Sequence, residues 1–390
     1  MDEAGAMLAL PPGLGGVDEE EKKKSRIAES LKKKEGERSD KWRKMARVVK
    51  KGTEGEGTAY DFDCRNPKLI DRTWKGIPDC WRAAAWYSFL ESSARYWKAV
   101  ETDEQLMAEF TRLQNVASPD DVQIDLDVPR TVNGHVMFRK RYRGGQRLLF
   151  RVLHAVSLFF PDIGYVQGMA SLAATLLCYF DEERCFVMMV KLWRYRGLER
   201  LYQPGFGGLM AALGDFEKRW LKGKDVAAKL VELGIDPTAY GTRWYLTLFN
   251  LSIPFAAQLR VWDVFMLLGD CEPEPEGASS AAARADEAAM GREVKREGKS
   301  VSFEPGVQGG EEVVKVTPPR GLDILHATSA ALMNALREVL MDSDFENAMK
   351  ALTAWIPIKD EEMLMKVARA EWKAHQGGGG GGLKRSKDGV

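Results

Sequence analysis

The hydrophobic residues between positions 72 and 270 recur with the three- and four-residue spacing of amphipathic helices, and alternating strand-like runs are scarce. Residues 145–160 show this spacing clearly, and Pro161 ends the segment because proline cannot continue a helix. Residues 169–179 are apolar on almost every face, which is typical of a helix buried at the centre of a domain. The pattern predicts an all-α fold.

Local signals place several helix ends. Pro78 predicts the start of a helix that continues through residue 90, because the missing N–H of proline is unpaired there in any case. Thr102 is the expected N-cap of a helix over residues 103–113, with Glu104 and Gln105 in its first turn. Further helices are predicted over residues 184–195, 209–221, 226–233, 241–249, 254–268, 322–340, 344–355 and 359–372.

The first seventy residues differ in character from the rest. Residues 1–40 are dense in Lys and Glu with few apolar partners, so we predict a disordered, charged N-terminal segment. Residues 41–71 are predicted to form a basic amphipathic flanking helix and a linker, with Trp42, Met45 and Val49 on one face of the helix. Such a helix can make a peripheral contact with a membrane or an acidic partner, but packing of Trp42 against the domain is favoured.

The main domain is expected to span residues 72–376, with one interruption. Residues 271–320 are rich in Ala, Glu, Gly, Pro and Ser, which predicts a disordered, low-complexity insertion. Residues 377–390 begin with a run of glycines and are expected to form a flexible tail.

The composition excludes several classes of protein. Lys and Arg together number 57, as do Asp and Glu, so no chain-wide charge attracts nucleic acid, and no nucleic-acid partner is expected. The five cysteines form no C-x-x-C motif and the four histidines have no metal-ligand spacing, so we expect no metal site and a reducing, cytoplasmic location. No secretory signal is recognisable, and the longest apolar run, residues 169–180, is too short to cross a bilayer.

Two short motifs carry the chemistry. Residues 124–130 read I-x-x-D-x-x-R and end at Arg130, and residues 165–167 read Y-x-Q and end at Gln167. Pro129 and the downstream Gly134 predict that Arg130 lies in a loop, and Gln167 lies between the turn after Pro161 and the buried helix. A projecting side chain backed by a rigid helix is suited to act on a partner.

An arginine and a glutamine are the groups that a protein would supply to a GTPase that hydrolyses GTP slowly on its own. A guanidinium is always charged and directs two donors toward phosphate oxygens, and supplied in trans it accelerates hydrolysis by roughly 10³–10⁵. A carboxamide can both accept from the attacking water and donate to a phosphate. The sequence contains no G-x-x-x-x-G-K-[ST] motif, so the nucleotide would have to arrive on a partner.

Other residues are expected to support these two. Arg82 and Trp86 are four residues apart on one helix face, and a cation–π contact between them is expected to hold the loop of Arg130. Asp127 is expected to anchor the same loop through a hydrogen bond or ion pair. Each motif alone is common in structural roles, and their order along the chain is what makes them informative.

With R-x-x-x-W at Arg82 and Trp86, the motifs resemble the three signature motifs of the TBC-domain family of Rab GTPase-activating proteins. Residues 75–82, 127–131, 164–169, 201–206, 244–249 and 260–265 extend the resemblance. It implies one helical domain of two lobes, with Arg130 and Gln167 as catalytic fingers and Arg82, Trp86, Asp127, Tyr165 and Gly168 as supporting residues.

The resemblance also implies a partner and a location. The partner is a Rab-family small GTPase in its GTP-bound form, which carries GTP and Mg²⁺, while this chain needs no cofactor of its own. The implied role is regulation of vesicle trafficking by a cytoplasmic protein, peripheral on endomembranes.

Two departures and one alternative remain. The chain has Leu268, Gly269 and Asp270 where the family usually has Glu-Gly, and the insertion splits a lobe that tends to be continuous in relatives. A non-catalytic Rab-binding scaffold, recruiting partners through the insertion or the basic N-terminus, is the alternative to a GTPase activator.

Overall fold

The computed structural model describes residues 17–51, 58–132, 134–139, 144–273 and 321–378. Residues 1–16, most of the predicted insertion and residues 379–390 lie outside this part of the chain. The predictions of disorder for those segments therefore concern residues beyond the description.

In chain order the elements are α2 (Val17–Arg43), β1 (Arg47–Lys50), β2 (Ala59–Asp61), α3 (Pro67–Trp74), α4 (Asp79–Tyr96), α5 (Asp103–Leu113), α6 (Asp121–Asp127), η1 (Val128–Arg130), α7 (Gly145–Phe159), α8 (Met169–Leu177), α9 (Glu182–Tyr195), α10 (Leu198–Tyr202), η2 (Pro204–Phe206), α11 (Gly207–Asp215), η3 (Phe216–Trp220), α12 (Asp225–Glu232), α13 (Thr238–Leu246), α14 (Phe255–Leu268), α16 (Asp323–Met341), α17 (Phe345–Thr353) and α18 (Glu361–Gly378). The predicted all-α fold is confirmed. Within the described residues β1 and β2 are the only strands, and they form one small antiparallel pair.

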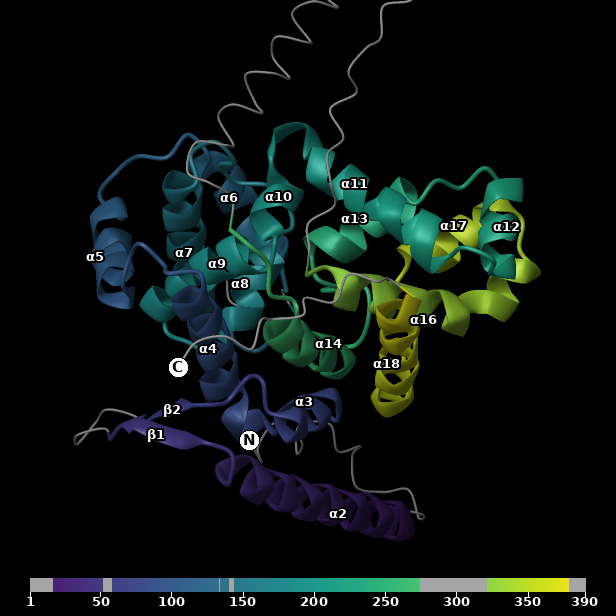
Figure 1. The fold of residues 1–390 in the computed structure, drawn as a ribbon, viewed down its shortest axis with the longest axis horizontal. Helices are drawn as coiled ribbons and strands as arrows, with labels where there is room; N and C mark the ends of the chain where they lie inside the picture. Colours follow the sequence, from purple (N-terminus) through teal and green to yellow (C-terminus); the bar gives the residue numbers. More distant parts are fainter. Residues whose placement is uncertain (1–16, 52–57, 133, 140–143, 274–320, 379–390) are drawn as a thin grey trace, which may run out of the picture.

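The helices form two groups joined by α14 (Figure 1). Helices α4 to α9 make up one group, and α11 to α13 with α16 to α18 make up the other. Helix α14 packs against α3, α4, α16 and α18, so it belongs to the core of both. No helix in the described ranges is both long and apolar enough to cross a membrane.

Several predicted helix ends agree with the structure because local capping determines them. Thr102 caps α5 by accepting from the backbone N–H of Gln105, whose side chain accepts from Thr102 N in return. Every residue of α8 is buried, as its apolar faces predict. The predicted helix over residues 209–221 instead divides into α11 and the π-helical turn η3.

One buried carboxylate joins α14 to α4. Asp263 has no exposed surface and accepts from Arg82 Nε at 2.9 Å, from Trp86 Nε1 at 2.9 Å and from the backbone N–H of Ile77 at 2.8 Å. Burial alone would lower the pKa of Arg82, but the carboxylate of Asp263 outweighs it and raises that pKa. Arg82 is therefore a permanent charge that requires this partner.

The structure corrects the sequence prediction between residues 17 and 51. Residues 17–40, predicted to be a disordered charged segment, belong to α2, and the helix ends at Arg43 rather than continuing past Val49. Val49 lies in strand β1 and is 65% exposed. Trp42 does pack against the domain, with 1% exposure and its ring 5.5 Å from that of Phe62.

The C-terminal part of α2 has hydrogen-bond partners in the body of the protein. Arg38 donates to Lys75 O at 2.9 Å, and Trp81 Nε1 donates to Ser39 Oγ at 2.9 Å. These bonds and the packing of Trp42 hold the C-terminal end of α2 against the domain.

The two chain ends that border residues 274–320 lie against each other. Gly321 has a φ of +102°, and a Cβ atom at this position would overlap the carbonyl oxygen of Gly269. Cys271 N donates to Tyr195 O at 3.0 Å, and Asp270 pairs with the fully buried Arg196 at 3.4 Å. The segment after α14 and the segment before α16 therefore meet, and the two helices pack together.

We predict that Asp263→Asn lowers the free energy of unfolding by about 3–5 kcal/mol, because the buried guanidinium of Arg82 would lose its buried counter-charge and keep only Asp79, which is 59% exposed. Urea denaturation measures the change. Asp40→Asn is the control, since Asp40 pairs with Arg43 at 3.2 Å in an exposed setting and its loss costs below about 1 kcal/mol. Equal losses in the two variants would contradict the central role of Asp263.

Candidate functional site

Arg130 lies at the end of η1, a single 3₁₀ turn that follows α6 directly. The prediction of an open loop is therefore wrong in detail, since the backbone up to Arg130 is helical. Pro129 suits the start of this turn because its φ is fixed near the helical value. The side chain of Arg130 is 58% exposed and projects from a rigid base.

Gln167 lies in the turn between α7 and α8. Gly164 and Gly168 flank it with φ angles of +63° and +112°, a region of backbone conformation that favours glycine. The N–H of Met169 closes the turn by donating to Val166 O at 3.2 Å. Gln167 is exposed, and the buried helix α8 begins two residues later.

Asp127 joins the two motifs. Its side chain is 3% exposed and accepts a 2.7 Å hydrogen bond from Tyr165 Oη on one oxygen. The other oxygen pairs with the guanidinium of Arg130 and accepts from Gln123 Nε2 at 3.4 Å. The buried carboxylate of Asp127 thus connects Arg130 to Tyr165, which lies two positions before Gln167.

Burial, followed by the bond to Asp127, raises the pKa of Tyr165. The phenol therefore stays protonated and remains a donor throughout the physiological range.

Asp120 makes a second connection that the sequence analysis missed. Its Oδ2 accepts from the backbone N–H of Tyr165 at 2.9 Å. A Cβ atom on Gly164 would lie 2.8 Å from the same oxygen, so only glycine leaves room for this bond. The sequence signal for this role is weak, because an aspartate just before a helix reads as an N-cap.

Gly168 packs close to the other half of the protein. A Cβ atom there would lie 3.5 Å from Thr247 Cγ2 and 3.7 Å from Tyr202 Oη. Tyr202 in turn donates to the carbonyl of Leu246. The turn that carries Gln167 is therefore positioned by both helical groups.

Arg82 and Trp86 do not hold the loop of Arg130, contrary to the prediction. The guanidinium carbon of Arg82 lies 6.0 Å from the ring centroid of Trp86, as a cation–π pair requires. Their hydrogen bonds, however, converge on Asp263 in α14. Arg82 also bonds to Asp79 and Tyr179, so the pair fixes the packing of α4.

Exposed apolar side chains lie on α6, the helix that leads into Arg130, and also around His135. Val122 and Leu126 are four residues apart on α6 and are 74% and 61% exposed. Val136 and Phe255 are 69% and 44% exposed, and the ring of Phe255 lies 6.4 Å from that of His135. Apolar residues beside an exposed arginine are typical of a surface that contacts another protein.

The site offers a positive charge and a carboxamide, each on a rigid support. Within the part of the chain that the structure describes, no three His, Cys, Asp or Glu side chains converge as metal ligands. Arg130 can stabilise negative charge and Gln167 can orient a polar molecule. Both functions require that the reacting group be brought from outside.

The comparisons agree with the motifs. A sequence model described as the Rab-GTPase-TBC domain matches residues 79–274. The TBC domain-containing protein C1778.09 of Schizosaccharomyces pombe is 42% identical over 306 residues, 78% of this chain and 61% of that protein. Rab GTPase-activating protein tbc-11 of Caenorhabditis elegans is 29% identical over 212 residues, 53% of this chain and 22% of that protein.

A solved structure supports the fold. The crystal structure of the Ypt/Rab-GAP domain of Gyp1p superposes with a TM-score of 0.57 and 14% identity, covering 87% of this chain and 99% of that one. This likeness concerns the fold alone. The chain spans less than two thirds of the length of either relative above.

We predict that Tyr165→Phe lowers the free energy of unfolding by about 1–2 kcal/mol, because the buried carboxylate of Asp127 loses a donor. Urea denaturation checks this value. Tyr240→Phe is the matched control, since the Tyr240 hydroxyl is buried and makes no hydrogen bond among the described residues. If the two substitutions cost the same, the bond between Tyr165 and Asp127 has no stabilising role.

Proposed function

The chain belongs to the Rab-GTPase-TBC domain family, and we propose that it accelerates GTP hydrolysis by a Rab-type small GTPase in the GTP-bound form. One observation carries the proposal. Arg130 and Gln167 are both exposed, and the bonded pair of Asp127 and Tyr165 links the segments that present them. The proposal is a dual-finger mechanism in which both side chains enter the nucleotide site of the partner.

Arg130 supplies charge in this mechanism. Negative charge develops on the phosphoryl oxygens as the bond to the leaving group breaks, and a guanidinium from outside neutralises it. Arg130 need not leave Asp127 to do so. A guanidinium has five N–H donors, so some can stay on the carboxylate while others bind phosphate oxygens. Asp127 then aims the guanidinium and lowers its freedom before the partner arrives.

Gln167 positions the attacking water. Its carbonyl oxygen accepts from the water and its amide N–H donates to the γ-phosphate or to the partner's backbone. Gly164 and Gly168 hold the turn in the left-handed region, and α8 supports it from behind. Proton abstraction is not required, because hydrolysis of GTP depends on positioning and on charge stabilisation.

The partner supplies the rest of the reaction. GTP and Mg²⁺ are carried by the GTPase, and the chain contributes no cofactor. The exposed apolar residues Val122 and Leu126 of α6 fit a protein surface that docks beside the nucleotide. We further propose that the protein works in the cytoplasm on endomembranes as a regulator of vesicle trafficking. Exposed basic residues of the N-terminal region, such as Lys41 and Arg43, would favour an anionic bilayer.

We predict that Arg130→Ala removes most of the acceleration of GTP hydrolysis, roughly a 10³-fold loss or more, because nothing else replaces the charge. Gln167→Ala is expected to lose a large part as well. Single-turnover phosphate release from a panel of GTP-loaded Rab GTPases measures both effects.

The control is Arg112→Ala, an exposed arginine on α5 that pairs with Glu109 at 2.7 Å. It is expected to keep the full rate. An unchanged rate with Arg130→Ala would refute the finger assignment. Tight binding to a GTP-bound Rab without acceleration across the panel would favour the scaffold function instead.

A further inference from the structure

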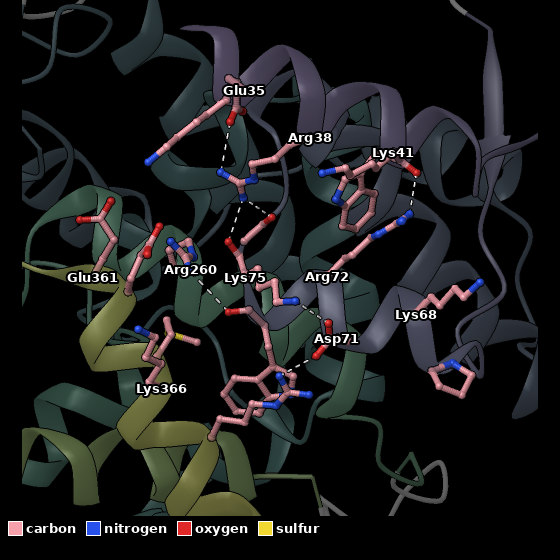
Figure 2. A pocket seen from close by; sticks show the side chains of 18 of the residues that line it. Glu35, Arg38, Lys41, Lys68, Asp71, Arg72, Lys75, Arg260, Glu361 and Lys366 are labelled. Carbon is pink, nitrogen blue, oxygen red and sulfur yellow. Dashed lines mark hydrogen bonds and ion pairs between the residues drawn. The ribbon is translucent and has the colours of Figure 1, made fainter. Parts of the chain in front are cut away.

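A basic cavity lies between α2, α3 and α18, on the opposite side of the molecule from α6 (Figures 1 and 2). Its volume is about 1360 Å³, and Arg260 of α14 also lines it. Ten Lys and Arg side chains and four carboxylates line this basic cavity, so positive charge is in clear excess. None of these residues takes part in the site of Arg130 and Gln167.

Several of the basic groups donate to backbone carbonyls, and one of them, Arg38, also pairs with the carboxylate of Glu35. Arg38 donates to the carbonyl oxygens of Lys75 and Gly76, and Arg72 donates to Lys41 O at 2.8 Å. A carbonyl satisfies a donor but does not neutralise its charge. The cavity wall thus retains most of the charge that its composition implies.

The central carboxylates are already shared. Asp71 accepts from Lys75 Nζ at 2.7 Å and from Arg369 Nη1 at 2.8 Å, and both bonds lower the pKa of Asp71. Glu35 pairs with Arg38 at 3.2 Å and accepts from the backbone N–H of Asp79 at 2.9 Å. Asp71 thus accepts hydrogen bonds from two cationic side chains. Glu35 accepts one from a cationic side chain and one from a backbone amide.

Arg260 has the weakest compensation. It is 9% exposed, its Nη2 donates to Trp74 O at 3.4 Å, and its Nε has no acceptor within the described ranges. Burial and the nearby charge of Arg38 lower the pKa of Arg260, while Asp263, Glu361 and Glu362 act in the opposite direction. Asp263 already pairs with Arg82, so it does not neutralise Arg260. Most of the other charged groups that line the cavity are positive and repel Arg260.

We propose that the basic cavity binds a ligand that carries several phosphate groups, either free or as the headgroup of a lipid. The positive side chains come from four elements, so one phosphate would reach only part of them. Arginine and lysine are the side chains that bind phosphate best, through forked and single donors respectively.

The ligand would fasten α2 to the body of the protein. Lys34 on α2 and Lys366 on α18 line opposite walls, and a polyanion between them would bridge elements far apart in sequence. The finger residues lie at the other end of the molecule. Occupancy of the cavity would therefore stabilise the N-terminal region without entering the GTPase site.

The test uses inositol hexakisphosphate, inorganic phosphate and phosphatidylcholine vesicles doped with phosphatidylinositol bisphosphate. Affinity is measured for the wild type, for Lys34→Ala with Lys366→Ala, and for Lys33→Ala with Lys373→Ala. Lys33 and Lys373 are exposed on the same two helices but do not line the cavity. Both double variants lose the same net charge, so attraction to the protein as a whole would fall equally in each.

We expect inositol hexakisphosphate to bind the wild type more tightly than inorganic phosphate does. The cavity variant should lose about tenfold or more in affinity, which corresponds to about 1.4 kcal/mol or more for the two lost charged contacts together. The control variant should stay within about twofold of the wild type. Binding of the vesicles as well would assign the ligand to a lipid headgroup, and binding of the soluble compound alone would assign it to a free polyphosphate. Equal losses in the two variants, or no binding of either polyphosphate probe, would overturn the proposal.

Discussion

The carboxylate of Asp263 is the constraint on which the rest of the structure depends. It is fully buried, and it gathers the backbone N–H of Ile77, the guanidinium of Arg82 and the indole of Trp86 around one point of α14. A charge in this position is tolerated only because each partner is in place. The bonds fix where α4 begins and how it meets α14, and α14 in turn contacts helices of both groups. Because Asp263 pairs with Arg82, it forms no ion pair with Arg260, which lies one turn earlier on α14.

The site of Arg130 and Gln167 repeats this design on a smaller scale. Asp127 is a second buried carboxylate, and it also binds a guanidinium, from Arg130 three residues later, and an aromatic donor, Tyr165, 38 positions away. The difference lies in exposure, because Arg82 is enclosed whereas Arg130 projects into solvent. Because Asp127 is buried and Arg130 is exposed, this ion pair directs a positive charge into solvent rather than only joining parts of the fold.

Local pattern predicts the helices well and long-range partners poorly. The capping residue Thr102 and the apolar faces of residues 169–177 act within one or two turns, so their sequence suffices. The role of Arg82 was misassigned because Asp263 is 181 positions away, and no spacing rule connects them. The helix over residues 17–43 was missed for a related reason, since Arg38 and Ser39 near its C-terminal end acquire partners only when α3 and α4 are folded beside them. Arg130 and Gln167 could be singled out because their motifs are short and local, but the bond between Asp127 and Tyr165 that unites them could not.

The close approach of Gly269 and Gly321 separates the length of the intervening segment from the architecture. Because the two ends already meet, the helical body needs no particular number of residues between α14 and α16. Natural variation can therefore lengthen, shorten or rewrite this segment while the packing of the two helices stays the same. For the same reason the junction is a suitable place to graft a foreign domain or to open the chain and create new termini.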